Sequence, residues 1–178
     1  MTTVAHSALG LLGWQLFAEE KSKKTLLLFF LIASMPDIDF ALFFFLGRAG
    51  LAFHQYYTHN IFFVVVTAVL FWPLLKSTGA KFAFLGVGCS HLVLDFLTID
   101  GSVPFGIPLF YPFSNHRFNF GIMPNIHKGT PTEIFSLHNL WVIGFEIAIF
   151  WVPILLAYRK PLTTYFFQKS FLEKVRSQ

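Results

Sequence analysis

Histidines and aspartates stand inside apolar stretches of this 178-residue chain, where polar side chains are costly. The stretch "SHLVLD" places His91 and Asp95 four residues apart, so both side chains lie on one face of a helix. Such a pair can bind one metal ion, or the carboxylate can orient the imidazole. A buried histidine–aspartate hydrogen bond that only stabilises packing explains the same spacing equally well.

The stretch "PDID" places Asp37 and Asp39 within another apolar run. On a regular helix these two carboxylates would point about 200° apart. Pro36 removes a backbone donor and disfavours helical angles at Met35, which predicts a helix break and a new half-helix that begins with the proline. The two acids then converge, and a divalent metal would neutralise them. The alternative is two acids at the mouth of a water-filled crevice.

Two other stretches contribute histidines. "FHQYYTHN" contains His54 and His59, whose spacing of five residues requires a loop-to-helix transition. "VAHSALGLLG" contains His6, with Gly10 and Gly13 on the same helix face, where they let another helix approach closely. Standing alone, these would be interfacial or packing histidines. Taken together, the predicted metal ligands are His6, Asp37, Asp39, His54, His59, His91 and Asp95.

The composition predicts an integral membrane protein whose helices carry these residues. Hydrophobic residues make up 55% of the chain, charged residues only 12%, and the mean hydropathy is +0.63. A soluble domain carries about 25% charged residues. We predict an all-α, polytopic transmembrane helical bundle of about five segments, one of them broken at Pro36. The segments lie near residues 4–18, 25–46, 61–75, 82–99 and 138–157.

Helix geometry predicts that several polar residues share one depth in the membrane. Counting 1.5 Å per residue from the basic end of each segment puts His6, Asp37, Asp95 and Glu146 roughly 18–20 Å from that end. In a hydrocarbon core about 30 Å thick, this is a layer in the outer half. Three alternative roles are open to Glu146: a general base, a further ligand, or a hydrogen-bonding group between helices.

Lysine and arginine set the predicted orientation. Basic clusters follow the first segment, separate the third from the fourth, and follow the fifth. With five spans they lie on the cytoplasmic side, so the 47–60 connection and the Pro-, Gly- and Phe-rich 100–137 loop are extracytoplasmic. Residues 1–160 then form the transmembrane domain, and 161–178 form a cytoplasmic interfacial tail. The single cysteine, Cys89, excludes an internal disulfide, and the net charge of +4 does not indicate nucleic acid.

The long loop carries groups that would bind an anion. In "YPFSNHRF", Arg117 would grip a phosphate in a bidentate manner, with His116 beside it. The alternative for Arg117 is a cation at the level of the lipid headgroups. His127 and Lys128 follow in the same loop.

These motifs resemble those of the YdjM-like family of membrane-bound, predicted metal-dependent hydrolases. The family pattern is matched in order by "HSALG", "PDID", "HQYYTHN", "SHLVLD" and "YPFSNHRF", from His6 to Arg117. Gln55 and Asn60 depart from the pattern, at positions where the family usually has arginine and serine. Any substrate contact of that arginine would then fall to Arg48 or Arg117. The resemblance implies a metal-dependent hydrolase in a bacterial or archaeal membrane and supplies no substrate.

The expected function is hydrolysis in the inner (cytoplasmic) membrane, at a site that faces the extracytoplasmic side. Seven imidazole and carboxylate ligands suit two zinc ions, and manganese or iron accept the same ligands. A metal-activated water would attack an ester, and two-metal sites characteristically hydrolyse phosphate esters. Asp39 or Glu146 would manage the proton, with Arg117 and His116 on the phosphate of a lipid or polyprenyl-phosphate substrate. The alternative is a non-enzymatic membrane protein, either a metal-stabilised scaffold or an ion or metal transporter.

Overall fold

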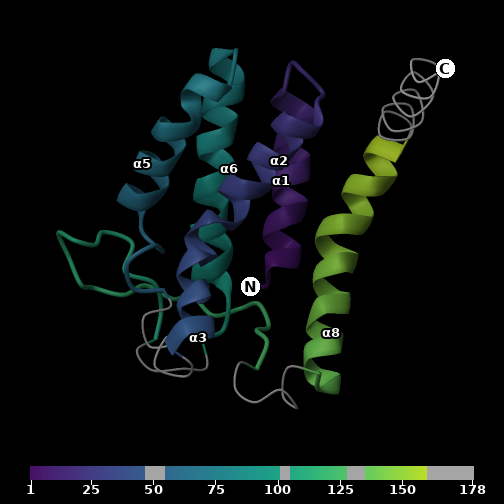
Figure 1. Ribbon diagram of the computed structural model, residues 1–178. Helices are drawn as coiled ribbons and strands as arrows, with labels where there is room; N and C mark the ends of the chain where they lie inside the picture. Colours follow the sequence, from purple (N-terminus) through teal and green to yellow (C-terminus); the bar gives the residue numbers. More distant parts are fainter. Residues whose placement is uncertain (47–54, 101–104, 128–134, 160–178) are drawn as a thin grey trace.

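The computed structural model describes residues 1–46, 55–100, 105–127 and 135–159 (Figure 1). These residues form helices and irregular connections, and they contain two isolated β-bridges but no strand. The predicted all-α class is therefore confirmed. The predicted ligand His54, together with Arg48, Lys128 and the tail at 161–178, lies outside the described residues.

Each of the five predicted apolar segments is helical. At the start of each one, a side chain accepts a backbone N–H of the first turn, which helix geometry would otherwise leave free. These capping residues are Thr2, Ser22, Asn60, Ser77 and Ser136. The helices are α1 (Thr3–Phe17), α2 (Lys23–Ser34), α3 (Ala41–Leu46), α5 (Ile61–Phe71), α6 (Thr78–Leu97) and α8 (Leu137–Glu146), which continues through a π-helical turn (Ile147–Trp151) to residue 159.

The break at Pro36 is a short 3-10 helix, Met35–Phe40, that joins α2 to α3. Pro36 lies in its first turn, where the missing N–H leaves no bond unmade. The prediction that Met35 leaves helical angles is wrong, because Met35 keeps φ −62° and ψ −36° and the preceding Ser34 departs instead, with φ −109° and ψ 0°. Three residues per turn leave the two aspartates of this helix about 120° apart, so they reach the site from different sides.

Helices α1, α2 and α6 pack together, α5 packs against α6, and α8 packs against α1 (Figure 1). Trp14, Phe29 and Phe84 are fully buried between them. Gly10 allows α1 and α2 to approach, since a Cβ at this position would lie 2.8 Å from the carbonyl oxygen of Phe29. The prediction that this glycine-bearing face admits another helix is confirmed.

Two described helices, Thr78–Leu97 and Leu137–Arg159, are long and apolar enough to cross a membrane. Only 17% of the apolar stretch in the second helix is buried inside the protein, and Trp141 and Leu156 on it are 58% and 63% exposed. Apolar surface left uncovered in this way is typical of contact with lipid. The helix Ile61–Leu74 is shorter, and five spans stay a prediction.

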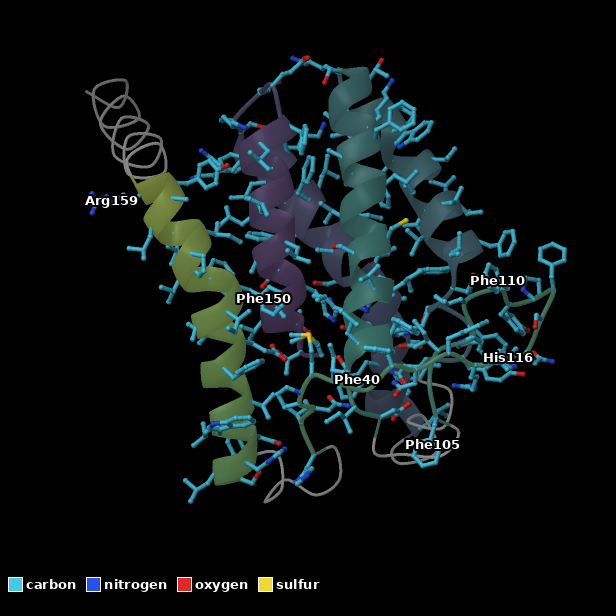
Figure 2. All side chains as sticks on the ribbon, turned by 180° about the vertical axis from the view of Figure 1, so that it is seen from behind. Phe40, Phe105, Phe110, His116, Phe150 and Arg159 are labelled. Carbon is cyan, nitrogen blue, oxygen red and sulfur yellow. The ribbon has the colours of Figure 1, made fainter. Side chains whose placement is uncertain are left out.

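Basic residues gather at one end of the bundle. Lys76, in the turn before α6, lies 2.8 Å from Glu20 in the turn after α1. The hydrogen bond and charge of Lys76 lower the pKa of the Glu20 carboxyl. Arg159, near the end of α8, lies toward the same end of the molecule (Figure 2). This arrangement agrees with the predicted grouping of the basic clusters, and the membrane side that they face stays a prediction.

Residues 105–127, the described part of the long connection, run as irregular backbone against the end of α6. The backbone N–H of Phe120 donates to the carbonyl of Phe96, and that of Met123 donates to the carbonyl of Leu97. These bonds satisfy carbonyl groups that the end of a helix leaves free. The loop is thereby held at the end of α6 that carries His91 and Asp95.

Candidate metal centre

Six of the seven predicted ligands meet in one place, which we call the polar cluster. The side chain of Asp37 is 21% exposed, and those of the other five are at most 4% exposed. The cluster comprises His6 from α1, Asp37 and Asp39 from the 3-10 helix, His59 from the segment before α5, and His91 and Asp95 from α6.

Four atoms form the centre of the polar cluster, and we call them the four-atom group. They are Asp37 Oδ1, His59 Nε2, His91 Nε2 and Asp95 Oδ2. His59 Nε2 lies 3.4 Å from the Asp37 oxygen and 3.2 Å from the Asp95 oxygen. His91 Nε2 lies 3.8 Å and 3.2 Å from the same two oxygens. The two nitrogens are 3.4 Å apart.

The separations around His59 Nε2 and His91 Nε2 suit neighbouring ligands of one metal ion. Ligand atoms about 2.0–2.1 Å from a zinc ion, placed at the corners of a tetrahedron, lie about 3.3 Å from one another. The five separations in the four-atom group range from 3.2 to 3.8 Å. The carboxylates of Asp37 and Asp95 also carry the charge that balances a divalent cation, which matters because uncompensated charges are costly in an apolar bundle.

Hydrogen bonds on the far ring nitrogens point both Nε2 lone pairs into the four-atom group. His91 Nδ1 lies 2.7 Å from the carbonyl oxygen of Ala33, which only accepts, so this nitrogen carries the hydrogen. His59 Nδ1 lies 3.2 Å from the Thr58 hydroxyl, and that hydroxyl donates to Asp39 Oδ2 at 2.7 Å. His59 Nδ1 must therefore be the donor to Thr58. Neutral imidazoles oriented in this manner are typical of metal ligands.

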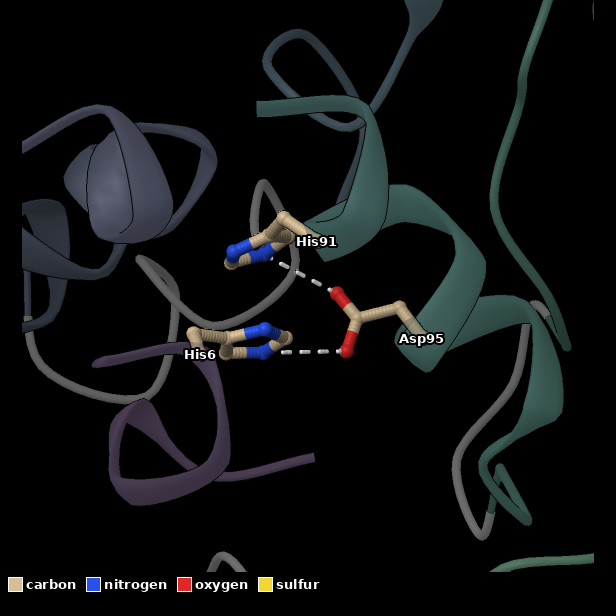
Figure 3. Close-up of side chains that lie close together, drawn as sticks. All are labelled: His6, His91 and Asp95. Carbon is tan, nitrogen blue, oxygen red and sulfur yellow. Dashed lines mark ion pairs between the residues drawn. The ribbon is translucent and has the colours of Figure 1, made fainter. Parts of the chain in front are cut away.

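His6 approaches the second carboxylate oxygen of Asp95 (Figure 3). Its ring stacks on His91, with centroids 3.6 Å apart, and its Nε2 lies 3.5 Å from Asp95 Oδ1. The α-amino group of Met1 lies 2.7 Å from the same oxygen. Neither ring nitrogen of His6 has a hydrogen-bond partner among the described residues. Asp95 is thus placed to serve two positions, one at the four-atom group and one beside His6.

Asp39 lies on the other side of the His59 ring. Its Oδ2 is 3.6 Å from His59 Nδ1 and accepts the backbone N–H of Gln55 at 2.9 Å. Gln55 has a φ of 65°, a left-handed conformation that is uncommon for a residue other than glycine. The geometry favours Asp39 as the group that orients His59, and its role as a ligand stays a prediction.

Glu146 is buried on α8 and binds Thr2 and Ala5 at the start of α1. Its Oε1 accepts the backbone N–H of Thr2 at 2.9 Å, and its Oε2 accepts the Thr2 hydroxyl and the N–H of Ala5. These bonds match the alternative of a hydrogen-bonding group between helices. The roles of general base and ligand stay predictions.

Arg117 lies over the segment that supplies His59. Its Nη1 donates to the carbonyl of Gly106 at 2.7 Å, and its guanidinium lies 5.4 Å from the ring centre of Tyr56. Partial burial lowers the pKa of the guanidinium. His116 is exposed and packs edge-on against Phe118, with centroids 4.7 Å apart. Phosphate binding by Arg117 and His116 stays a prediction.

Two groups that orient the histidines were missed by the sequence-based prediction. Thr58 directly precedes His59 within the motif that carries the family resemblance, so its hydroxyl was a usable signal. The carbonyl of Ala33 gave no signal, because any residue at that position offers the same oxygen.

A helical bundle with uncovered apolar helices and a buried histidine–aspartate cluster defines a membrane protein with a candidate metal centre. The family model described as YdjM inner membrane protein matches residues 1–169. The chain therefore belongs to the YdjM inner membrane protein family, which confirms the resemblance in its motifs. Comparison with curated proteins and with solved structures finds no match.

Proposed function

We propose that this protein is a multi-pass membrane hydrolase that uses divalent metal ions to cleave a phosphate ester of a lipid. The four-atom group is the observation that carries the proposal. His59 Nε2 and His91 Nε2 lie 3.4 Å apart, and each lies 3.2–3.8 Å from oxygens of Asp37 and Asp95, so three separate segments of the chain meet in a buried position. Helix packing alone does not explain why these polar side chains meet. Each polar group inside an apolar bundle costs free energy, so an apolar side chain would pack more favourably.

Two metal positions are proposed. The four-atom group would hold one ion, and the second would lie between Asp95 Oδ1 and His6. His54 stays a predicted ligand outside the described residues. Zinc suits this imidazole and carboxylate set, and manganese and iron accept it as well. A divalent ion supplies hydrolysis with a water that ionises near neutral pH.

Asp39 is the carboxylate that we assign to proton handling. His59 Nδ1 donates to the Thr58 hydroxyl, which in turn donates to Asp39, so Asp39 keeps the hydrogen on the outer nitrogen of His59. Of the two carboxylates considered for this task, Asp39 belongs to the polar cluster, whereas the oxygens of Glu146 accept hydrogen bonds from Thr2 and Ala5.

The apolar surroundings of Asp37 suit a lipid substrate. Asp37 is the most exposed side chain of the polar cluster, and the adjacent Ile38 and Leu42 are 52% and 37% exposed. An acyl or polyprenyl chain would lie against such apolar side chains, while Arg117 would hold the phosphate. A phospholipid or a polyprenyl phosphate meets both requirements, and a phosphomonoester and a phosphodiester fit equally.

A metal-stabilised scaffold is the second candidate, and the four-atom group itself favours it. Structural zinc sites have four protein ligands, whereas catalytic sites keep one position for water. The four-atom group already supplies four ligand atoms, so hydrolysis depends on the position beside His6. The number of ions bound by each chain therefore separates the two candidates.

Metal content and hydrolysis measured on the same detergent-purified sample test the proposal. We expect the wild-type protein to carry metal near stoichiometrically and to release phosphate or a headgroup from at least one member of a lipid panel. His91→Ala and Asp37→Ala should lose both properties, while Glu20→Gln, at the basic end, should retain both. Metal-free wild-type protein with no hydrolysis contradicts the proposal. Tightly bound metal without hydrolysis supports the scaffold, and weak, rapidly exchanging metal supports a transporter.

The substrate assignment has its own test. Arg117→Ala should raise KM for the phosphate-bearing lipid by about tenfold, because a hydrogen bond to a charged group is lost. Arg117→Lys should recover part of this loss, since the positive charge remains while the bidentate geometry does not. An unchanged KM in both variants would remove Arg117 from the substrate site.

A further inference from the structure

Helix α8 holds α1 through two polar side chains. Glu146 accepts hydrogen bonds from Thr2 and Ala5, and the indole Nε1 of Trp151 donates to the carbonyl of Val4 at 2.8 Å. All three partners belong to the N-terminal end of α1. Figure 2 shows Phe150, between these two positions in sequence, at the boundary of α8 and α1.

Glu146, on α8, supplies a carboxylate to the first turn of α1, which has none of its own. The first turn of α1 contains no acidic residue, and its capping residue Thr2 accepts only the N–H of Val4 through its side chain. Both oxygens of Glu146 face this turn, where they bind the N–H groups of Thr2 and Ala5 and the Thr2 hydroxyl. A carboxylate at the N-terminal end of a helix is also favoured by the helix dipole.

The π-helical turn explains how Glu146 and Trp151 reach the same partner. On a regular α-helix, two residues five positions apart point about 140° away from each other. Between them α8 forms a π-helical turn, in which the N–H of Val152 donates to the carbonyl of Ile147, five residues earlier. A π-helical turn is wider than an α-helical one, so residues five apart point only about 50° away from each other. The turn therefore presents both side chains to α1.

The contact with Glu146 lies next to His6 in the chain, at an N–H that also donates to the carbonyl of Thr2 at 3.1 Å. Glu146 binds the N–H of Ala5, the residue directly before His6, while the His6 ring has no hydrogen-bond partner among the described residues. The ring stacks on His91 and lies 3.5 Å from Asp95 Oδ1. We infer that Glu146 and Trp151 are positioning residues that set His6 at the second metal position, an inference that rests on the proposed function.

Titration of detergent-purified, metal-depleted full-length protein with Co²⁺, followed by visible absorption, tests this inference. Glu146→Gln places an amide N–H₂ against a backbone or hydroxyl donor, and it should weaken the second Co²⁺ by on the order of tenfold and alter its absorption bands. Trp151→Phe should weaken the same ion by about threefold, since one neutral hydrogen bond is lost. The first Co²⁺, at the four-atom group, should bind as in the wild type.

Matched controls are Glu20→Gln, which alters an exposed glutamate, and Trp141→Phe, which alters an uncovered tryptophan on the same helix. Both should titrate like the wild type. If Glu146→Gln binds both Co²⁺ ions as the wild type does, the inference is overturned and the proposed function still stands. If Glu146→Gln does not fold, Trp151→Phe takes its place, and wild-type binding of both ions in that variant overturns the inference in the same way. Wild-type protein that binds no Co²⁺ overturns both.

Discussion

Two pairs of histidines stack within the described part of the chain, in different surroundings. His6 and His91 stack with ring centroids 3.6 Å apart, and His127 and His138 stack with centroids 4.1 Å apart. The planes within each pair are nearly parallel, at 15° and 11°. The first pair is buried beside a shared carboxylate, whereas the second is exposed, with His138 bonded to the carbonyl of Asn125.

The surroundings of the first pair, rather than its ring geometry, make it part of a candidate metal centre. The buried pair has Asp95 oxygens 3.2 and 3.5 Å away, and the side chains of both histidines are 0% exposed. The exposed pair can hydrate, and its neighbour Asn139 ties the loop to α8 by exchanging hydrogen bonds with the backbone of His127. We therefore expect metal chemistry at the first pair and loop attachment at the second.

Removing one histidine from each pair should give the largest difference in metal affinity between two variants. His91→Ala deletes one corner of the four-atom group and should weaken metal affinity by at least about a hundredfold. His138→Ala should leave the affinity unchanged, because its side chain lies outside the polar cluster. Equilibrium dialysis against buffered zinc measures both variants. Equal weakening in the two would erase the distinction between the pairs.

Metal removal should destabilise the protein through the buried pair alone. Saturation at about 100 times the dissociation constant contributes about 2.7 kcal/mol, which corresponds to a fall in Tm of about 5–10 °C on chelation for a chain of this size. His91→Ala should show almost no response to the chelator, and His138→Ala should respond like the wild type. A Tm that ignores chelation in the wild type would count against a bound metal.

A smaller effect is expected from the group that orients His59. Thr58→Val removes the hydroxyl that accepts from His59 and donates to Asp39, so metal affinity should fall by about tenfold. Thr67→Val, at a buried threonine on α5, is the matched control and should retain full affinity. If both variants bind metal equally well, the hydroxyl does not orient the ligand.

The smallest effect on stability is expected at the exposed pair. His138→Ala should change Tm by less than about 2 °C, as is usual for a surface substitution. The lost bond to Asn125 should nevertheless speed amide hydrogen exchange in residues 120–127. Exchange that stays slow in this loop would show that His138 does not attach it.

Much of the helical framework could be predicted, because apolar runs and capping residues are local signals. The five predicted segments coincide with helices, and Pro36 marks the interruption. The form of the interruption could not be predicted, since a 3-10 turn lets Met35 stay helical where local preference disfavours it. An apolar run predicts a helix more readily than a membrane span, because a span also needs sufficient length. Two of the described helices have that length.

Counting residues along the helices placed His6, Asp37 and Asp95 at one depth, and these three do meet in the polar cluster. Glu146 was placed at the same depth but binds Thr2 and Ala5 instead, so depth alone does not decide which residues meet. Contacts between distant segments were beyond the sequence. Glu146 had three roles open because its partner Thr2 stands 144 residues away. Similarly, nothing local distinguishes Asp39, on the outer nitrogen of His59, from Asp37, on the inner one.

X-ray absorption at the edge of the metal bound to purified wild-type protein tests directly whether histidines and aspartates of the polar cluster bind a metal ion. The polar cluster predicts a first shell of only nitrogen and oxygen atoms at about 2.0–2.2 Å, with an outer scattering of imidazole rings that becomes weaker in His91→Ala, where His59 remains. A sulfur shell at about 2.3 Å, a spectrum without imidazole scattering, or purified protein that binds no metal would contradict the account.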